Sequence, residues 1–146
     1  MSRKLIFLLT TAAIAAAAAP AFALPSATIH GVTLEAAPPH YVGKCPGVVT
    51  FHGEVRVTGK FDGGKPVEIG YQFTRSDGGT GQNQFFNATH DGAYPLTETW
   101  TLGGPQVPHF GGWEKVKTWV TDSGEGGNKP PVWSNEAHFT LTCKDR

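Results

Sequence analysis

The stretch 48–58, VVTFHGEVRVT, and the stretch 67–74 that follows it, VEIGYQFT, decide the fold. In both segments apolar and polar residues alternate with a period of two, and a glycine-rich turn at 59–64 separates them. This alternation is typical of half-buried antiparallel strands, because successive side chains of a strand point to opposite faces of the sheet. The two segments therefore predict consecutive strands, each with one face in the core.

Similar short patterns continue on both sides of this pair. No segment has the apolar period of a helix over the ten or so residues that a helix needs, and the 19 glycines and 11 prolines also disfavour helices. The expected strands span 28–36, 48–58, 67–74, 83–89, 95–102, 113–121 and 136–143. This series predicts an all-β fold, an immunoglobulin-like antiparallel β-sandwich of about seven strands, with a small β-barrel as the alternative.

The first 23 residues have the pattern of a secretory signal. Arg3 and Lys4 precede an apolar run, and Ala-Phe-Ala at 21–23 has the small-x-small pattern of a cleavage site. A retained membrane anchor is the alternative, but Pro20 interrupts the run, and a span needs about 20 strongly apolar residues. We therefore expect 1–23 to be a signal peptide and 24–146 to form a single secreted or periplasmic domain, with no membrane span after cleavage.

The charge balance argues against one class of partner. Removal of 1–23 leaves 10 Lys plus Arg (12 less Arg3 and Lys4) against 12 Asp plus Glu, a formal net charge of −2. Such a surface lacks the basic footprint that binding to a phosphate backbone requires. Nucleic acid is therefore not expected as a partner.

Cys45 and Cys143 are the only cysteines of the chain. Cys45 precedes the strand at 48–58 and Cys143 closes the last strand, and in an immunoglobulin-like order these two points could meet at one end of the sandwich. A redox-active thiol pair is the alternative, but such pairs usually lie two residues apart. A structural disulfide in an oxidising compartment is the expected arrangement.

A set of motifs occurs in a fixed order along the chain. The motifs are YVGKCP at 41–46, the segment 67–77, TWTLG at 99–103, the pair GW at 112–113, and SNEAHFTLTC at 134–143. Together they resemble a family of small secreted bacterial immunoglobulin-like domains of undefined function. The resemblance implies a sandwich with a Cys45–Cys143 disulfide, export by a bacterium and no catalytic residues. The chain departs from the family pattern mainly in the loop 121–132.

The candidate metal and catalytic residues are few. The six histidines are scattered without a His-x-His pair, so we expect no metal site and no cofactor, although His52 and His138 could be neighbours in space. No Gly-x-Ser-x-Gly motif is present. Glu98 falls on the apolar face of its strand. Acid pairs such as Asp62 with Glu68, or Glu98 with Glu114, can be assembled from the 12 acidic residues, but an acid pair needs a cleft to shift its pKa values. We therefore expect no catalytic residues and not an enzyme.

Aromatic residues supply the candidate binding surface. Two tryptophans share the polar face of the strand at 113–121 with Lys115 and Lys117, and two more aromatic residues fall in expected loops. With the opposite register both lysines would be buried, which is costly. Exposed aromatic surface can stack on sugar rings or anchor a protein partner. The candidate residues are Trp113, Trp119, Phe110 and Trp133.

The sequence thus predicts a non-enzymatic exported immunoglobulin-like module that binds an unknown protein or glycan at the cell envelope or outside the cell. One alternative is a structural component of the envelope, and another is a secreted hydrolase inhibitor. A glycan binder would depend on Trp113 or Trp119, whereas an inhibitor would use Phe110 or Trp133 on a protruding loop.

Overall fold

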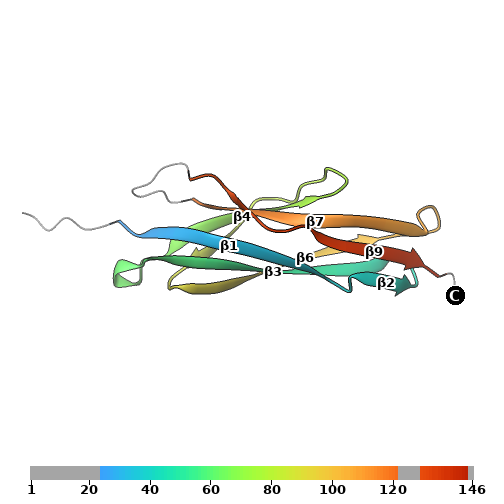
Figure 1. Ribbon diagram of the computed structural model, residues 1–146, viewed down its shortest axis with the longest axis horizontal. Helices are drawn as coiled ribbons and strands as arrows, with labels where there is room; N and C mark the ends of the chain where they lie inside the picture. The colour runs from blue at the N-terminus through green and yellow to red at the C-terminus, as the bar shows by residue number, and fades with distance from the viewer. Residues whose placement is uncertain (1–23, 122–128, 145–146) are drawn as a thin grey trace, which may run out of the picture.

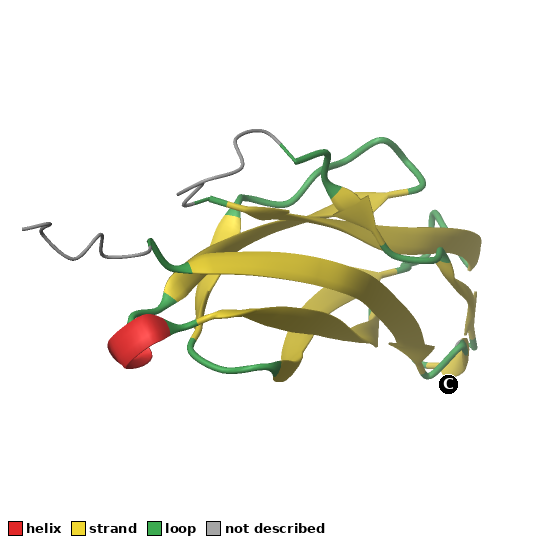
Figure 2. Ribbon diagram, turned by 60° about the vertical axis from the view of Figure 1, so that its left-hand side comes forward, coloured by secondary structure: helices red, strands yellow, loops and turns green. Residues whose placement is uncertain are grey.

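A computed structural model describes residues 24–121 and 129–144. The signal peptide expected at 1–23 and most of the loop at 121–132 lie outside the described residues. Strands make up most of the described chain, and its only helical element is a 3-10 turn, η1 (Asp62–Gly64) (Figure 2). The strands are β1 (Ser26–Ala37), β2 (His40–Gly43), β3 (Gly47–Lys60), β4 (Val67–Arg75), β5 (Gln84–Ala88), β6 (Gly92–Leu102), β7 (His109–Val120), β8 (Val132–Trp133) and β9 (Ala137–Cys143).

The strands form two sheets that pack as a sandwich. The smaller sheet is three-stranded, in the order β1-β3-β6, and the six-stranded sheet runs β2-β9-β7-β4-β5 with β8 paired to β7. All strand pairs are antiparallel except β2 with β9, which is parallel. Figure 1 shows the strands of both layers running along the long axis of the molecule. The architecture is therefore the expected sandwich and not the alternative small barrel.

The predicted alternation explains the core. In β3, Val49, Phe51 and Val55 are fully buried between the sheets, while the residues between them face solvent or the sheet rim. The Phe51 ring packs edge-on against Phe139 of β9, with ring centroids 5.6 Å apart, so this contact joins the two layers. Burial of such side chains is the main stabilising contribution to the fold.

All seven expected strands are present, and two short strands were missed. β2 and β8 are too short for a period of two to be visible in sequence, and tertiary pairing with β9 and β7 defines them. β7 begins at His109, whereas the sequence predicted a start at 113. The prediction began too late because Gly111 and Gly112 have no side chains and interrupt the visible alternation. Trp133, expected in a loop, is part of β8.

The position expected for Phe110 was wrong. Phe110 belongs to β7 and not to a loop, and its side chain is half-buried. It stacks on Phe139 with ring centroids 5.8 Å apart and meets Trp100 edge-on at 5.6 Å. Phe110 is therefore a member of the core rim and not a protruding anchor.

The expected disulfide between Cys45 and Cys143 is present. Parallel pairing aligns Gly43 with Cys143, which leaves the two cysteine Cα atoms 5.4 Å apart. Gly103 lies against both sulfur atoms with a φ of +87°, a position where only glycine fits without strain. The bridge ties the connection between β2 and β3 to the end of β9, and so links the two sheets at one end of the sandwich.

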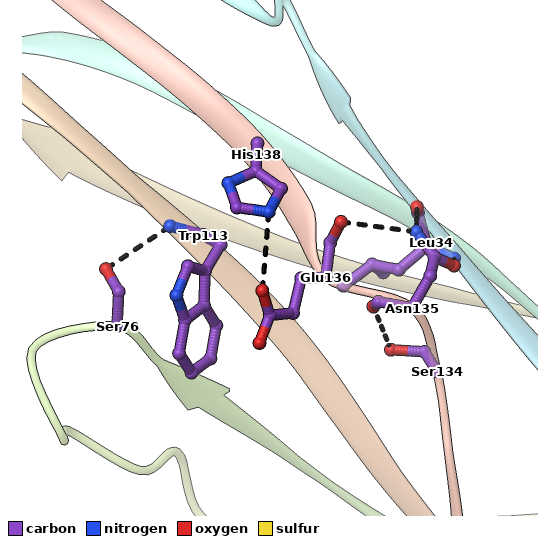
Figure 3. A network of polar contacts seen from close by, with 7 residues as sticks. All are labelled: Leu34, Ser76, Trp113, Ser134, Asn135, Glu136 and His138. Carbon is purple, nitrogen blue, oxygen red and sulfur yellow. Dashed lines mark hydrogen bonds and ion pairs between the residues drawn. The ribbon is translucent and has the colours of Figure 1, made fainter.

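A second link between the sheets lies just before β9. The Asn135 side chain accepts a hydrogen bond from the Leu34 N–H (3.0 Å) and donates one to the Leu34 carbonyl (2.8 Å), as Figure 3 shows. Ser134 accepts a hydrogen bond at its Oγ from the Val116 N–H of β7 (2.9 Å). Together these bonds hold the segment that carries Trp133 against β7.

Candidate functional site

The outer face of β7 carries the tryptophans that the sequence placed on a polar face. Trp113, Lys115, Lys117 and Trp119 are all partly exposed, whereas the three residues between them are buried. The predicted register of this strand is therefore confirmed. It leaves two indoles and two ammonium groups on the outer surface of the six-stranded sheet.

These side chains interlock with Trp133 of β8. The Lys115 Nζ lies 5.1 Å from the ring centroid of Trp113 and 4.9 Å from that of Trp133. The Lys117 Nζ lies 5.4 Å from the Trp119 centroid and 5.9 Å from that of Trp133. Each lysine thus contacts two indoles through cation–π interactions, worth about 0.5–1 kcal/mol each at exposed sites. We call Trp113, Lys115, Lys117, Trp119 and Trp133 the Trp–Lys ladder.

Neighbouring strands hold one end of the ladder in place. Trp119 lies directly over Gly70 of β4, where any Cβ would overlap the indole. Phe85 of β5 meets Trp119 edge-on with ring centroids 6.3 Å apart and is itself 52 % exposed. Trp133 is 45 % exposed. The outer surface of this sheet therefore presents a connected aromatic area, of which Trp133 and Phe85 are the most open members.

A groove adjoins the ladder at Trp113. It crosses three neighbouring strands, since Thr140 of β9 pairs with both His40 of β2 and Gly111 of β7, and Trp113 pairs with His138. Its volume is about 470 Å³, within the range of small-ligand sites. We call it the Gly111 groove; it is lined by His40, Ser76, Gly111, Gly112, Trp113, His138, Phe139 and Thr140.

Local contacts orient the polar side chains of the Gly111 groove. His40 Nδ1 lies 2.9 Å from Thr140 Oγ1, and His138 Nε2 lies 3.3 Å from Glu136 Oε2. Trp113 donates its backbone N–H to Ser76 Oγ at 3.2 Å (Figure 3). The groove therefore combines an indole wall with imidazole and hydroxyl groups, an arrangement suited to binding a polar ligand.

Sequence reasoning missed this groove, because its residues come from strands far apart in the chain. The only local signal was the glycine pair at 111–112 inside a strand. The suggestion that His52 might neighbour His138 was wrong, since His52 lies on β3 of the smaller sheet and His138 on β9 of the larger one. The two histidines thus belong to different outer faces of the sandwich.

The carboxylate pair considered in sequence does come together, but inside the sandwich. Glu114 of β7 is only 1 % exposed, and Glu98 of β6 faces it from the other sheet. Burial first, and then the negative charge of Glu98, raise the pKa of Glu114 to about 7, against a smaller opposing effect of Arg75. Within the described residues, Glu114 Oε2 has no hydrogen-bond partner. Glu114 is thus enclosed between the sheets, whereas Glu98 is partly exposed.

Two more groups border this acid pair. The Arg75 guanidinium lies 4.8 Å above the Trp100 ring, and its Nε is 3.3 Å from Asp77 Oδ1. Burial, and then the charge of Glu98, raise the pKa of Tyr71. Glu114 is therefore the buried member of a polar group on the side of β7 opposite the ladder, and Arg75, Tyr71 and Glu98 around it are partly exposed.

Residues 24–121 and 129–144 contain no group of three or more His, Cys, Asp and Glu side chains placed to hold a metal ion. Among the same residues, no helix has the length and apolarity needed to cross a membrane.

Comparisons with known proteins address the fold alone. No protein-family model matches the sequence, and no curated protein matches it significantly. Among solved structures, the chain is similar to a CARDB domain from Pyrococcus furiosus, solved in complex with di-metal ions, with a TM-score of 0.52 and 14 % identity over 85 % of this chain and 97 % of that one. A putative ApaA protein from Bordetella pertussis gives a TM-score of 0.29 at 16 % identity over 82 % and 94 % of the two chains, too low to support an argument. The first likeness supports the immunoglobulin-like fold.

Proposed function

We propose that the protein is a non-enzymatic, exported immunoglobulin-like module that binds a glycan through the outer face of its six-stranded sheet. The observation that carries this proposal is the Trp–Lys ladder, which continues into the Gly111 groove on the same face. Export is supported by the signal pattern of 1–23 and by the disulfide, because disulfides persist in oxidising compartments. The site of action is then the periplasm or the outside of the cell.

The dimensions of this face suit an extended ligand. Trp113 and Trp119 are six residues apart on one strand, which corresponds to about 20 Å at roughly 3.3 Å per residue. Indole surfaces can stack on the apolar face of a sugar ring, and imidazole and hydroxyl groups can bond to its hydroxyls. A glycan chain could therefore contact the ladder and the groove at the same time.

The acid pair of the interior supports a binding role over a catalytic one. Glycoside-cleaving acid pairs flank the scissile bond in an open site, whereas Glu114 is 1 % exposed between the sheets. The hydrolase-inhibitor alternative loses one of its two anchors, because Phe110 is half-buried against Trp100 and Phe139.

A purely structural role for the ladder is the second candidate. Two observations favour it: the lysine ammonium groups already contact the faces of the indole rings, and Trp119 packs directly over Gly70. In that case the ladder would stiffen the sheet of an envelope component and bind nothing.

Binding to a glycan array by the oxidised domain 24–146 tests the proposal, with tryptophan fluorescence as a second readout. Trp133→Ala should weaken binding at least tenfold, because exposed indoles commonly dominate such interfaces. His52→Ala, on the outer face of the smaller sheet, is the matched control and should bind as the wild type. If the wild type binds no glycan, or if Trp133→Ala loses thermal stability but not affinity, the structural role replaces the proposal.

A further inference from the structure

We infer that the Gly111 groove is the subsite that holds one neutral pyranose ring of the glycan, with Trp113 as its wall and the backbone at Gly111 as its floor. This inference rests on the proposed function and names the part of the face at which ligand recognition is concentrated. The other ladder residues, Trp119 and Trp133 among them, contact further sugars along the glycan chain.

The first argument is that the fold does not require a glycine at 111. The residue lies inside β7, its pairing with Thr140 is regular, and it is not among the glycines with positive φ. A Cβ added there would approach no atom closer than 3.8 Å, which is an ordinary van der Waals distance. Any small side chain could therefore occupy this position.

Other strand glycines of the same sheet contrast with Gly111. A Cβ at Gly112 would lie 2.5 Å from Ser76 Oγ, and one at Gly70 would overlap the Trp119 ring. At those two positions packing explains the glycine. Gly31 in β1 also has free space, but it lies at the irregularity in the pairing of β1 with β3.

A glycine inside a regular strand weakens it, and such a glycine often marks a place where a ligand approaches the backbone closely. At Gly111 the missing side chain leaves the outer face open beside Trp113, which follows two residues later on β7, and beside Thr140, its partner on β9. Gly111 is one of the residues that line the groove. Packing therefore does not require a glycine at position 111, but the missing side chain does shape the outer surface.

The second argument is the chemistry of the walls. No Lys or Arg is among the described residues that line the groove, so an anionic group would find no permanently charged cation there. The polar atoms are imidazole nitrogens and hydroxyl oxygens, which can accept as well as donate hydrogen bonds. A neutral pyranose ring matches both features, because it has an apolar C–H face and a rim of hydroxyl groups.

The third argument is that the polar groups are already oriented. His40 is held by Thr140 through Nδ1, and His138 by Glu136 through Nε2, as Figure 3 shows for the second pair. Among the described residues, the other ring nitrogen of each histidine has no protein partner. Side chains fixed in this way lose little conformational entropy when they bind a ligand.

The test is Gly111→Val in the oxidised domain 24–146, probed with soluble neutral polysaccharides: a glucan, a mannan, a galactan and a xylan. Valine suits a strand and meets no close atom at this position, so the thermal midpoint should stay near that of the wild type. Because valine fills the floor of the groove, affinity should fall at least tenfold. Gly31→Val, on the smaller sheet, is the matched control and should bind as the wild type.

The outcomes separate this inference from the proposed function. If Gly111→Val binds as the wild type while Trp133→Ala does not, the groove inference fails and the glycan module stands. If the wild type binds glycans on the array but none of the neutral polysaccharides, the groove inference fails and the glycan module stands; if it binds neither, both fail. In NMR titrations the imidazole signals of His40 and His138 should shift on adding the bound polysaccharide, and shifts confined to Trp119 and Trp133 would contradict the inference.

Discussion

The two sheets have inner faces of the same kind but very different outer faces. On β3 of the smaller sheet, the outward residues include His52, Glu54 and Arg56, and the ion pair between the last two is largely exposed. On β7 of the larger sheet, the outward residues belong to the Trp–Lys ladder. A sandwich requires apolar residues only on its inner faces, because many kinds of polar or charged residue are tolerated on the outer faces. A sandwich does not in general require an aromatic outer face, and the variants below measure how far the two faces differ.

The largest effect on stability should come from the disulfide, which links the two sheets. Replacing Cys45 and Cys143 with serine opens a loop whose ends are 98 residues apart, which should cost about 4–5 kcal/mol by the chain-entropy estimate. Denaturant unfolding of the oxidised and the double-serine proteins measures this loss. A difference below about 2 kcal/mol would mean that other links, such as that of Asn135 to Leu34, already hold the sheets together.

The next largest effect should come from the inner face of β7. The pKa of Glu114 rises from the usual 4.5 to about 7 on folding, so the folded state favours the protonated form. The stability this provides is fully present below pH 4.5 and is lost as the pH rises through 7. At 1.36 kcal/mol per pH unit, the loss is about 3 kcal/mol.

Glu114→Gln should remove this loss, so the variant should be more stable than the wild type at pH 8 and should unfold with a flatter pH dependence between pH 4 and 8. Denaturant unfolding across that range is the measurement. Glu54→Gln, on the outer face of the smaller sheet, is the control and should leave the pH dependence unchanged. A wild type with equal stability at pH 4 and pH 8 would contradict the account of Glu114.

A smaller effect on stability should follow from displacing Trp119 of the ladder from its position over Gly70. Gly70→Ala places a methyl group where the Trp119 indole lies, which should cost about 1–3 kcal/mol and change the tryptophan signals in near-ultraviolet circular dichroism. Gly31→Ala on the smaller sheet meets no atom within 4 Å and should change stability by less than about 1 kcal/mol. Equal effects of the two substitutions would show that Trp119 is not held against Gly70.

The smallest effect should come from the lysines of the ladder. Lys115→Met and Lys117→Met each remove two cation–π contacts at an exposed site, and each should cost about 1–2 kcal/mol. Arg56→Met removes only an exposed ion pair and should cost less still. Thermal unfolding of the three variants compares the two faces directly. If all three behave alike, the ladder contributes to the surface and not to stability.

Sequence alone predicted the strands whose alternation is long enough to read. The strands β3 and β4 were recognised because each alternates without interruption, whereas β2 and β8 are defined by their partners. Glu98 was correctly placed on an apolar face, but nothing local indicated that Glu114 would face it from the other sheet. Phe110 was misplaced because the glycines after it hid the start of β7.

The features of the candidate site also divide into those that the sequence predicted and those that only the tertiary structure revealed. The outward direction of Trp113 and Trp119 follows from the period of one strand, and could be read from β7 alone. The contacts of Trp133 with both lysines depend on the pairing of β8 with β7, which joins segments from different parts of the chain. The Gly111 groove is formed by three neighbouring strands, so no local sequence pattern predicted it.

By itself the sequence predicted an all-β fold with a sandwich preferred to a small barrel, the residues of each long strand that face the core, and a structural disulfide between the two cysteines. These properties depend on a local period and on a count of two thiols. Only the tertiary structure decided which strands are neighbours, and with that the ladder, the groove and the buried acid pair. The physical reason is that strand pairing is a long-range contact between backbones, and backbone hydrogen bonds carry almost no information about which sequence they join.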